Sequence, residues 1–156
     1  MVREWRNRSL SETKFPYIVT DVLYIKVRED RRVVSKRCHV AIGISESGNR
    51  EIICLMIQDG ESESTWANFF KYLNKRGLYG TKLVISDSHT GLVFVICQSF
   101  TGVSWQRCRV YFMRNVLTHV PKRDSKAFRE AIKSIFRFTD IELARRAKNE
   151  LIDQFA

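Results

Sequence analysis

A segment with helical spacing interrupts the strand-like part of this chain, and it limits how a sheet can be built. Four apolar residues recur there at intervals of three and four, which places them on one face of a helix. These residues are Trp66, Phe69, Phe70 and Leu73. Three strand-like segments precede this helix and a shorter one follows it. Because such a helix lets the following strand run parallel to an earlier one, the order predicts an α/β fold with a mixed sheet.

The other elements of the sheet follow from apolar runs and turn residues. Short turns, one of them at Ser47-Gly48-Asn49, predict that the first three strands form an antiparallel meander. Residues 90–100 are apolar almost throughout, which indicates a buried helix that crosses over to a last, short strand. The expected strands are residues 17–28, 33–44, 51–57, 82–86 and 103–105.

The chain after Arg107 has a helical pattern throughout. Thr139 and Glu142 have the spacing of a capping box and predict the start of one helix. Leu143, Ala147 and Leu151 form the apolar stripe of that helix. The preceding helix is predicted to bury one face made of Phe128, Ile132, Ile135 and Phe136.

Two aspartates belong to apolar, strand-like stretches. Asp21 lies inside the first predicted strand, and Asp87 ends the fourth. A carboxylate in such surroundings is costly unless it is neutralised, and a bound cation is the usual remedy. If the fourth strand pairs with the first, the two carboxylates would face each other and could bind Mg²⁺ or Mn²⁺. The structural alternative is that Asp21 points outward and Asp87 caps the next helix.

The charge of the chain favours a polyanionic partner. Its 156 residues include 27 Lys and Arg against 17 Asp and Glu, a net charge of +10. Neutralising phosphates with these cations would release condensed counterions and drive binding to nucleic acid. The cations are spread along the chain rather than gathered in a tail, so the basic surface is expected to belong to the folded domain.

The cysteines and the apolar runs bear on the compartment. Cys54 and Cys97 lie in apolar runs and are predicted to be buried, and the four cysteines form no zinc pattern with the histidines. The sequence has no disulfide framework, signal peptide or apolar run of membrane-spanning length. These features predict a cytoplasmic protein that does not enter a membrane.

Four short motifs occur in order along the chain. They are Asp21-x-x-Tyr24-x-Lys26-Val27-Arg28, Ala41-Ile42-Gly43, Ser86-Asp87-x-His89-x-Gly91-Leu92 and Trp105-Gln106-Arg107-Cys108-x-Val110-x-Phe112-x-Arg114-Asn115. The two aspartates in these motifs are 66 residues apart (87 − 21). Together, the motifs and this spacing resemble the catalytic region of Mutator-type transposases of bacterial insertion sequences.

The resemblance implies an RNase H-like fold with a catalytic triad of two aspartates and a glutamate. Asp21 and Asp87 match the first two members, which implies that both are catalytic residues and ligands of a two-metal Mg²⁺ or Mn²⁺ site. The family's glutamate follows a helical insertion and is expected beyond residue 156. Three glutamates of the helical part are instead interpreted as surface or capping residues: Glu130, Glu142 and Glu150.

The resemblance also implies partners and phosphate contacts. The partner would be double-stranded DNA, at transposon ends and at a target, and the full-length protein would be a nucleoid-associated homo-oligomer. One departure from the family pattern is Tyr111, which stands where the family usually has histidine. The residues expected to contact DNA are Lys26, Arg28, His89, Arg107, Arg109 and Arg114.

The resemblance divides the chain into three parts. Residues 1–16 are expected to be a connector, residues 17–115 an incomplete RNase H-like catalytic core, and residues 116–156 the beginning of the helical insertion. The leading interpretation is therefore a fragment of a transposase catalytic domain that cleaves DNA strands and transfers them. The alternatives are a catalytically inactive DNA-binding remnant of a transposase and, more remotely, a host RNase H-like nuclease.

Overall fold

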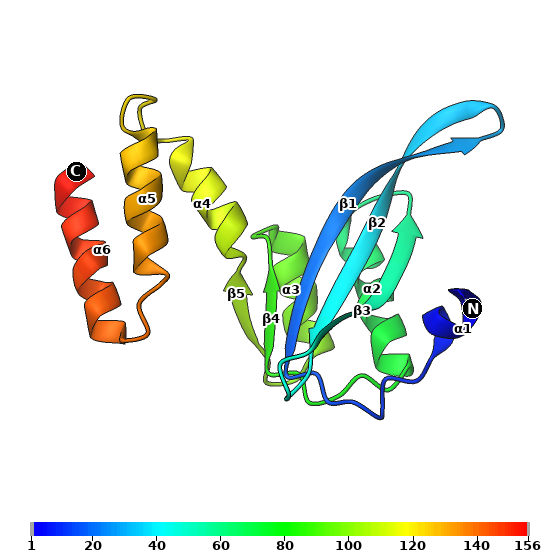
Figure 1. Cartoon of the computed structure of the whole chain (residues 1–156). Helices are drawn as coiled ribbons and strands as arrows, with labels where there is room; N and C mark the ends of the chain where they lie inside the picture. Colours follow the sequence, from blue (N-terminus) through cyan, green and yellow to red (C-terminus); the bar gives the residue numbers. More distant parts are fainter. Residues whose placement is uncertain (1, 156) are drawn as a thin grey trace. The chain divides into compact units, whose positions relative to one another are not determined.

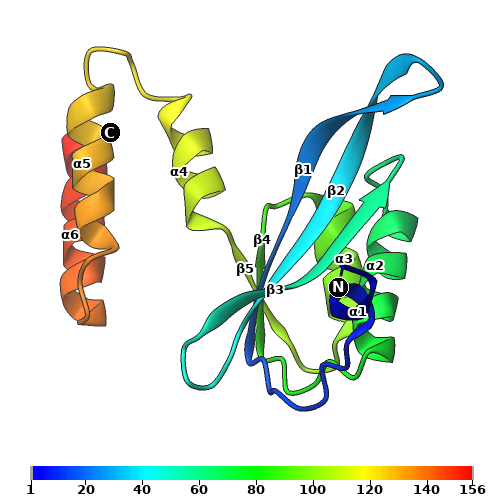
Figure 2. The same ribbon diagram turned by 45° about the vertical axis from the view of Figure 1, so that its right-hand side comes forward.

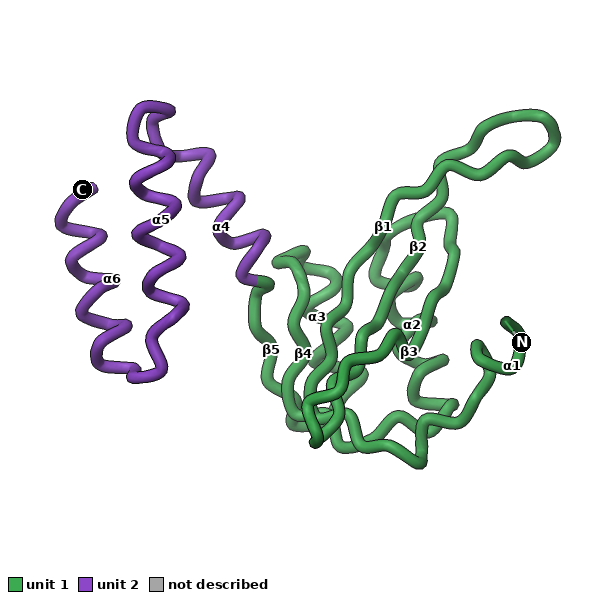
Figure 3. Tube along the Cα trace, in the orientation of Figure 1, with its two compact units in different colours: residues 1–108 green, residues 109–156 purple. Residues whose placement is uncertain are grey.

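The computed structural model describes residues 2–155 and divides the chain into two compact units (Figure 3). Unit 1 extends to Cys108, and unit 2 begins at Arg109. Unit 1 contains α1 (Val2–Asn7), β1 (Tyr17–Glu29), β2 (Arg32–Ile44), β3 (Arg50–Gln58), α2 (Glu63–Lys75), β4 (Leu83–Ser86), α3 (Thr90–Ser99) and β5 (Ser104–Arg107). Unit 2 contains α4 (Arg109–Leu117), α5 (Ser125–Ile135) and α6 (Ile141–Phe155). The boundary expected after residue 115 falls inside α4.

The sheet of unit 1 has five strands in the order β3-β2-β1-β4-β5 (Figure 1). β1, β2 and β3 pair antiparallel, whereas β4 runs parallel to β1 and β5 runs parallel to β4. This is the mixed sheet that the order of segments predicts, with the fourth strand beside the first. None of the helices within residues 2–155 is long and apolar enough to cross a membrane.

The hairpin of β1 and β2 forms an arm that extends past the other strands (Figure 2). β3 pairs with β2 only from Arg37 onward, and β4 pairs with β1 only at Tyr17–Val19. At the tip, Asp30 and Arg31 both have positive φ angles, of 47° and 63°. This two-residue turn matches the right-handed twist of the strands that it joins, which explains why the hairpin stays regular to its end.

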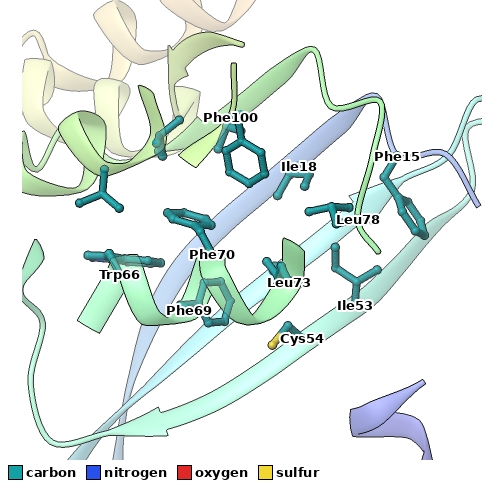
Figure 4. Packing of buried hydrophobic residues seen from close by; sticks show 14 of the residues in the cluster. Phe15, Ile18, Ile53, Cys54, Trp66, Phe69, Phe70, Leu73, Leu78 and Phe100 are labelled. Carbon is teal, nitrogen blue, oxygen red and sulfur yellow. The ribbon is translucent and has the colours of Figure 1, made fainter. Parts of the chain in front are cut away.

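The core of unit 1 lies between one face of the sheet and the helices α2 and α3 (Figure 4). The four apolar residues of α2 are fully buried, as their spacing predicts. Ile18, Ala41 and Val84 meet them from three neighbouring strands. Ser62 caps α2, because its hydroxyl accepts a hydrogen bond from the Thr65 N–H at 3.3 Å. The crossover helix therefore fixes β4 against β1 through a single packed layer.

The sequence prediction for α3 was only half right. Leu92, Val95 and Ile96 are buried, but Phe94 is 52% exposed and Cys97 is also exposed. A continuous apolar run cannot show which of its faces meets the core, because every face has the same polarity. α3 packs on the sheet by one face and leaves the other uncovered by unit 1.

Unit 2 has a small core of its own, made of Phe128, Ile132 and Leu151. Phe136 was expected in this core but lies just after α5 and is 41% exposed. The expected capping box at Thr139 is also wrong. The Asp140 carboxylate caps α6 instead, since Oδ1 accepts hydrogen bonds from the N–H groups of Glu142 at 2.7 Å and Leu143 at 3.0 Å.

The stability of unit 1 is predicted to depend on pH through His39. This side chain is fully buried beside Trp66, with ring centroids 4.5 Å apart, and burial lowers its pKa from the ordinary value of 6.5. The carbonyls of Arg37 and Met56 oppose that shift in part. The unfolded chain therefore binds more protons than the folded one below about pH 6.5, so the free energy of unfolding decreases as the pH falls through that value.

Urea unfolding at a series of pH values measures this effect. His39→Gln should flatten the slope between pH 6.5 and the lowered pKa. An unaltered slope in His39→Gln would exclude His39 as its source.

Candidate active site

The register between β1 and β4 brings Asp21 and Asp87 to the same level of the sheet. Every aligned pair, from Tyr17 with Leu83 to Val19 with Ile85, is 66 residues apart. The two aspartates have the same separation, so the register continued by two residues aligns them. Neighbouring strands are about 4.8 Å apart, which is close enough for two carboxylates to share one cation.

Asp21 is positioned by the alternation of β1. Its neighbour Thr20 is buried, and the Thr20 hydroxyl donates a hydrogen bond to the Val40 carbonyl at 2.9 Å. Because successive residues point to opposite faces, Asp21 lies on the face away from α2 and α3. It is half-buried, and its Oδ1 accepts a hydrogen bond from the Val22 N–H at 2.8 Å. This placement explains how a carboxylate fits into an apolar strand.

Asp87 is held in the turn between β4 and α3. Its Oδ1 accepts a hydrogen bond from the His89 N–H at 3.2 Å, and its main-chain carbonyl accepts one from the Ser86 hydroxyl at 2.7 Å. The Ser86 hydroxyl in turn accepts a bond from Trp105 Nε1 at 2.9 Å. His89, not Asp87, is the N-cap residue of α3, and it makes no side-chain capping bond. The alternative role of Asp87 as the helix cap is therefore not what the structure has.

Glu63, in the first turn of α2, is a neighbour of Gly91 that the sequence did not predict. A Cβ atom at Gly91 would lie 2.8 Å from Cγ of Glu63 and 3.4 Å from Cε1 of His89. The first turn of α2 thus reaches the first turn of α3. Glu63 looked like an ordinary acidic residue in the first turn of a helix, so no sequence signal distinguished it.

The other residues expected near the site of unit 1 divide into two groups. His89 is exposed two residues after Asp87, and Arg107 aligns with Ser86 at the adjacent strand end. Lys26 and Arg28 are exposed on the hairpin arm. At about 3.3 Å per residue they lie roughly 17 and 23 Å along β1 from Asp21. Any DNA contact that they make would be to a part of the substrate far from the carboxylates.

Arg109 and Arg114 belong to unit 2. The guanidinium of Arg109 lies 5.3 Å from the centroid of the Phe136 ring, and that of Arg114 lies 5.7 Å from the Tyr111 ring. Such contacts are cation–π interactions, which hold each guanidinium in a defined place. Tyr111 therefore acts here as a platform for Arg114.

The donors at the aligned aspartates are two carboxylates. Magnesium is commonly bound by one or two protein carboxylates, with water and substrate phosphate completing its octahedron. The pair suits that ion, since both residues are partly accessible. Within the same residues, no three side chains of His, Cys, Asp or Glu gather where they could hold a metal.

Comparison with known proteins identifies the family of this chain. The model of the family "Transposase, Mutator family" matches residues 1–156. The chain belongs to this family of transposases.

Curated relatives agree with the family match. The chain is 65% identical over 155 residues to the transposase for insertion sequence element IS256 in transposon Tn4001 of Staphylococcus aureus. It is 36% identical over 144 residues to the transposase for insertion sequence element ISRM5 of Rhizobium meliloti. The first match covers 99% of this chain and 40% of the relative, and the second covers 92% and 36%. The chain thus spans about two fifths of the length of these relatives.

Two solved structures resemble this chain weakly, with low TM-scores. The Drosophila P element transposase strand transfer complex matches with a TM-score of 0.43 and 10% identity, over 66% of this chain and 28% of the other. The HTLV-2 integrase catalytic core domain in complex with magnesium has the same TM-score and 15% identity, over 76% of this chain and 82% of the other. The assignment of the fold rests on the strand order and on the family match, independently of these two structures.

The hydrogen bonds through Ser86 predict a measurable coupling. Ser86→Ala should lower the free energy of unfolding by about 1–3 kcal/mol, because it removes a buried hydroxyl and leaves Trp105 Nε1 without its acceptor. Trp105→Phe introduced into that variant should then cost less than it does in the wild type, which a double-mutant cycle with urea unfolding measures. The exposed Ser104→Ala is the control and should be close to neutral. Strictly additive losses would mean that the two side chains do not interact.

Proposed function

We propose that this chain carries the catalytic core of a transposase that cleaves and joins DNA strands by metal-dependent phosphoryl transfer. The observation that supports this most is the shared register position of Asp21 and Asp87 in a member of the Mutator transposase family. The net charge of +10 fits DNA as the substrate. Transposon ends, target DNA and an oligomeric, nucleoid-associated assembly belong to the same proposal for the longer protein.

In this mechanism the two aspartates act as metal ligands. Divalent ions bound there would supply Lewis acidity for the attacking and leaving oxygens of an in-line displacement at phosphorus. Two carboxylates brought side by side would repel each other, and a cation bound between them would offset that repulsion. The His89 N–H and the bonds through Ser86 orient Asp87 toward that task.

The nucleophile would be a water molecule or a DNA 3′-hydroxyl. Its oxygen forms a new bond to phosphorus while the 3′-oxygen on the other side of the phosphate leaves. The exposed imidazole of His89 and the strand-end Arg107 are the groups of unit 1 best placed to contact the scissile phosphate. Neither role requires a contact with the distant arm residues Lys26 and Arg28.

Divalent-metal binding by this chain tests the proposal directly. In a titration of the whole chain with Mn²⁺, followed by electron paramagnetic resonance or calorimetry, one specific site should saturate. Asp21→Asn and Asp87→Asn should each weaken that site by at least about tenfold, as expected when one of two carboxylate ligands is lost. Asp153→Asn, on the exposed face of α6, removes the same charge and should have no effect.

The same variants then enter a DNA-cleavage assay. With the segments that only the longer relatives contain supplied, nicking of DNA that carries the element's ends should disappear in Asp21→Asn and Asp87→Asn but persist in Asp153→Asn. Cleavage that survives in either site variant would remove that residue from the mechanism.

DNA binding without cleavage is the second candidate function. It is favoured by the absence, within residues 2–155, of any third metal-ligating side chain beside the two carboxylates. In that case the chain should bind DNA without added metal, with a log affinity that falls linearly with log salt concentration. Binding that requires Mg²⁺ would favour the catalytic function instead.

A further inference from the structure

A pocket of about 460 Å³ lies between α4 and α5, wholly within unit 2. It is about as large as the pockets that commonly bind small molecules. Its walls come from one face of α4 and from the end of α5 with the residues that follow it. The lining consists of Arg109, Val110, Met113, Arg114, Leu117, Arg129, Lys133, Phe136 and Arg137.

The charge of this lining has one sign. Five of the nine residues are cationic and none is acidic. Within residues 2–155, Lys133 is the one cation of the lining that has an ion pair, with Glu130 at 2.9 Å between Nζ and Oε1. Concentrating unneutralised cations around a concave surface raises the local positive potential. The pocket is therefore suited to an anion.

The remaining four residues make part of the wall apolar. Val110, Met113 and Leu117 follow one another along α4, and Phe136 completes the apolar part of the lining. Phe136 is 41% exposed although the preceding helix, α5, buries Phe128 and Ile132. A phosphate ion alone would leave the apolar part of the wall exposed to water. The geometry therefore favours a ligand that is anionic at one end and flat and apolar at the other.

The Phe136 ring is held in place before any ligand binds. The Arg109 guanidinium lies over it at 5.3 Å, and the Phe112 ring meets it edge-on with centroids 6.5 Å apart. An aromatic ring fixed beside several arginines is how proteins bind single-stranded DNA: the base stacks on the ring, and the cations contact the phosphates. In a duplex the bases are stacked on one another and unavailable to such a ring.

We propose that this pocket binds an unpaired nucleotide of DNA. The base packs against Phe136 and Met113, and the flanking phosphates are bound by Arg114, Arg129 and Arg137. The inference rests on the proposed function for its choice of DNA. It adds a second site, separate in its residues from the aspartates of unit 1, that recognises a frayed or single-stranded segment.

Fluorescence anisotropy with the whole chain tests this site through its charge. The probe is a labelled duplex with a short single-stranded extension. Arg129→Ala combined with Arg137→Ala should lower the log–log salt slope by about 1.4, which makes the affinity roughly sevenfold less sensitive to salt between 50 and 200 mM. Arg146→Ala combined with Lys148→Ala removes two exposed cations of α6, outside the pocket, and should leave the slope unchanged.

The base-binding part is tested with Phe136→Ala and an extension made of abasic nucleotides. Phe136→Ala should weaken binding to the normal extension by about tenfold and leave binding to the abasic extension and to blunt duplex unchanged. Because Phe136 is partly exposed, circular dichroism should show an unaltered fold. Equal binding of normal and abasic extensions by the wild type would overturn the proposal.

Two further results separate this site from its competitors. The Mn²⁺ titration of the aspartates is done without DNA, so failure of the catalytic proposal is recognised independently of DNA binding at the pocket. An equal decrease of the salt slope in the Arg129/Arg137 and Arg146/Lys148 variants would mean that DNA binds to general surface charge and not to the pocket. This result would contradict the proposal. Displacement of the extended duplex by polyglutamate at equal charge concentration would indicate an acidic peptide site and contradict it as well.

Discussion

The parallel pairing of β1 with β4 is the interaction on which the candidate active site depends. The two strands are far apart in the sequence and are joined through β2, β3 and the crossover helix α2. The buried residues of α2 press this helix against the sheet. A shift of one residue in the β1–β4 register would move the carboxylates of Asp21 and Asp87 to opposite faces. Packing in the core thus determines whether the two carboxylates lie on the same face of the sheet.

Much of this arrangement could be predicted from the sequence because it follows from strong periodicity. The buried face of α2 and the order of strands agree with the structure, and so does the pairing of the fourth strand with the first. Predicting that Asp21 and Asp87 lie at the same level of the sheet required the resemblance to a known family as well. Periodicity alone allowed an outward-pointing Asp21, which the structure has, and a capping Asp87, which it does not have. The roles of the two residues in catalysis remain proposals.

The features that the sequence did not predict depend on tertiary contacts or on competition between neighbours. Asp140 caps α6 because its short carboxylate reaches two N–H groups, although Thr139 has the more familiar spacing to Glu142. Phe136 has helical spacing to the core residues, but α5 ends at Ile135 and the ring turns toward the arginines. The sequence predicted the lengths of the hairpin strands, but the register that takes Lys26 away from the site is visible only in the structure.

The family assignment supports phosphoryl transfer as the proposed chemistry, and the two units would contribute to it in different ways. Unit 1 would hold the reacting phosphate, and unit 2 would hold an unpaired part of the DNA strand. A crystal structure of this chain grown with Mn²⁺, with anomalous scattering used to locate the ion, tests the central claim most directly. We expect a manganese peak about 2 Å from an oxygen of Asp21 and from one of Asp87. Side chains that point to opposite faces of the sheet, or a peak bound by neither, would contradict the account.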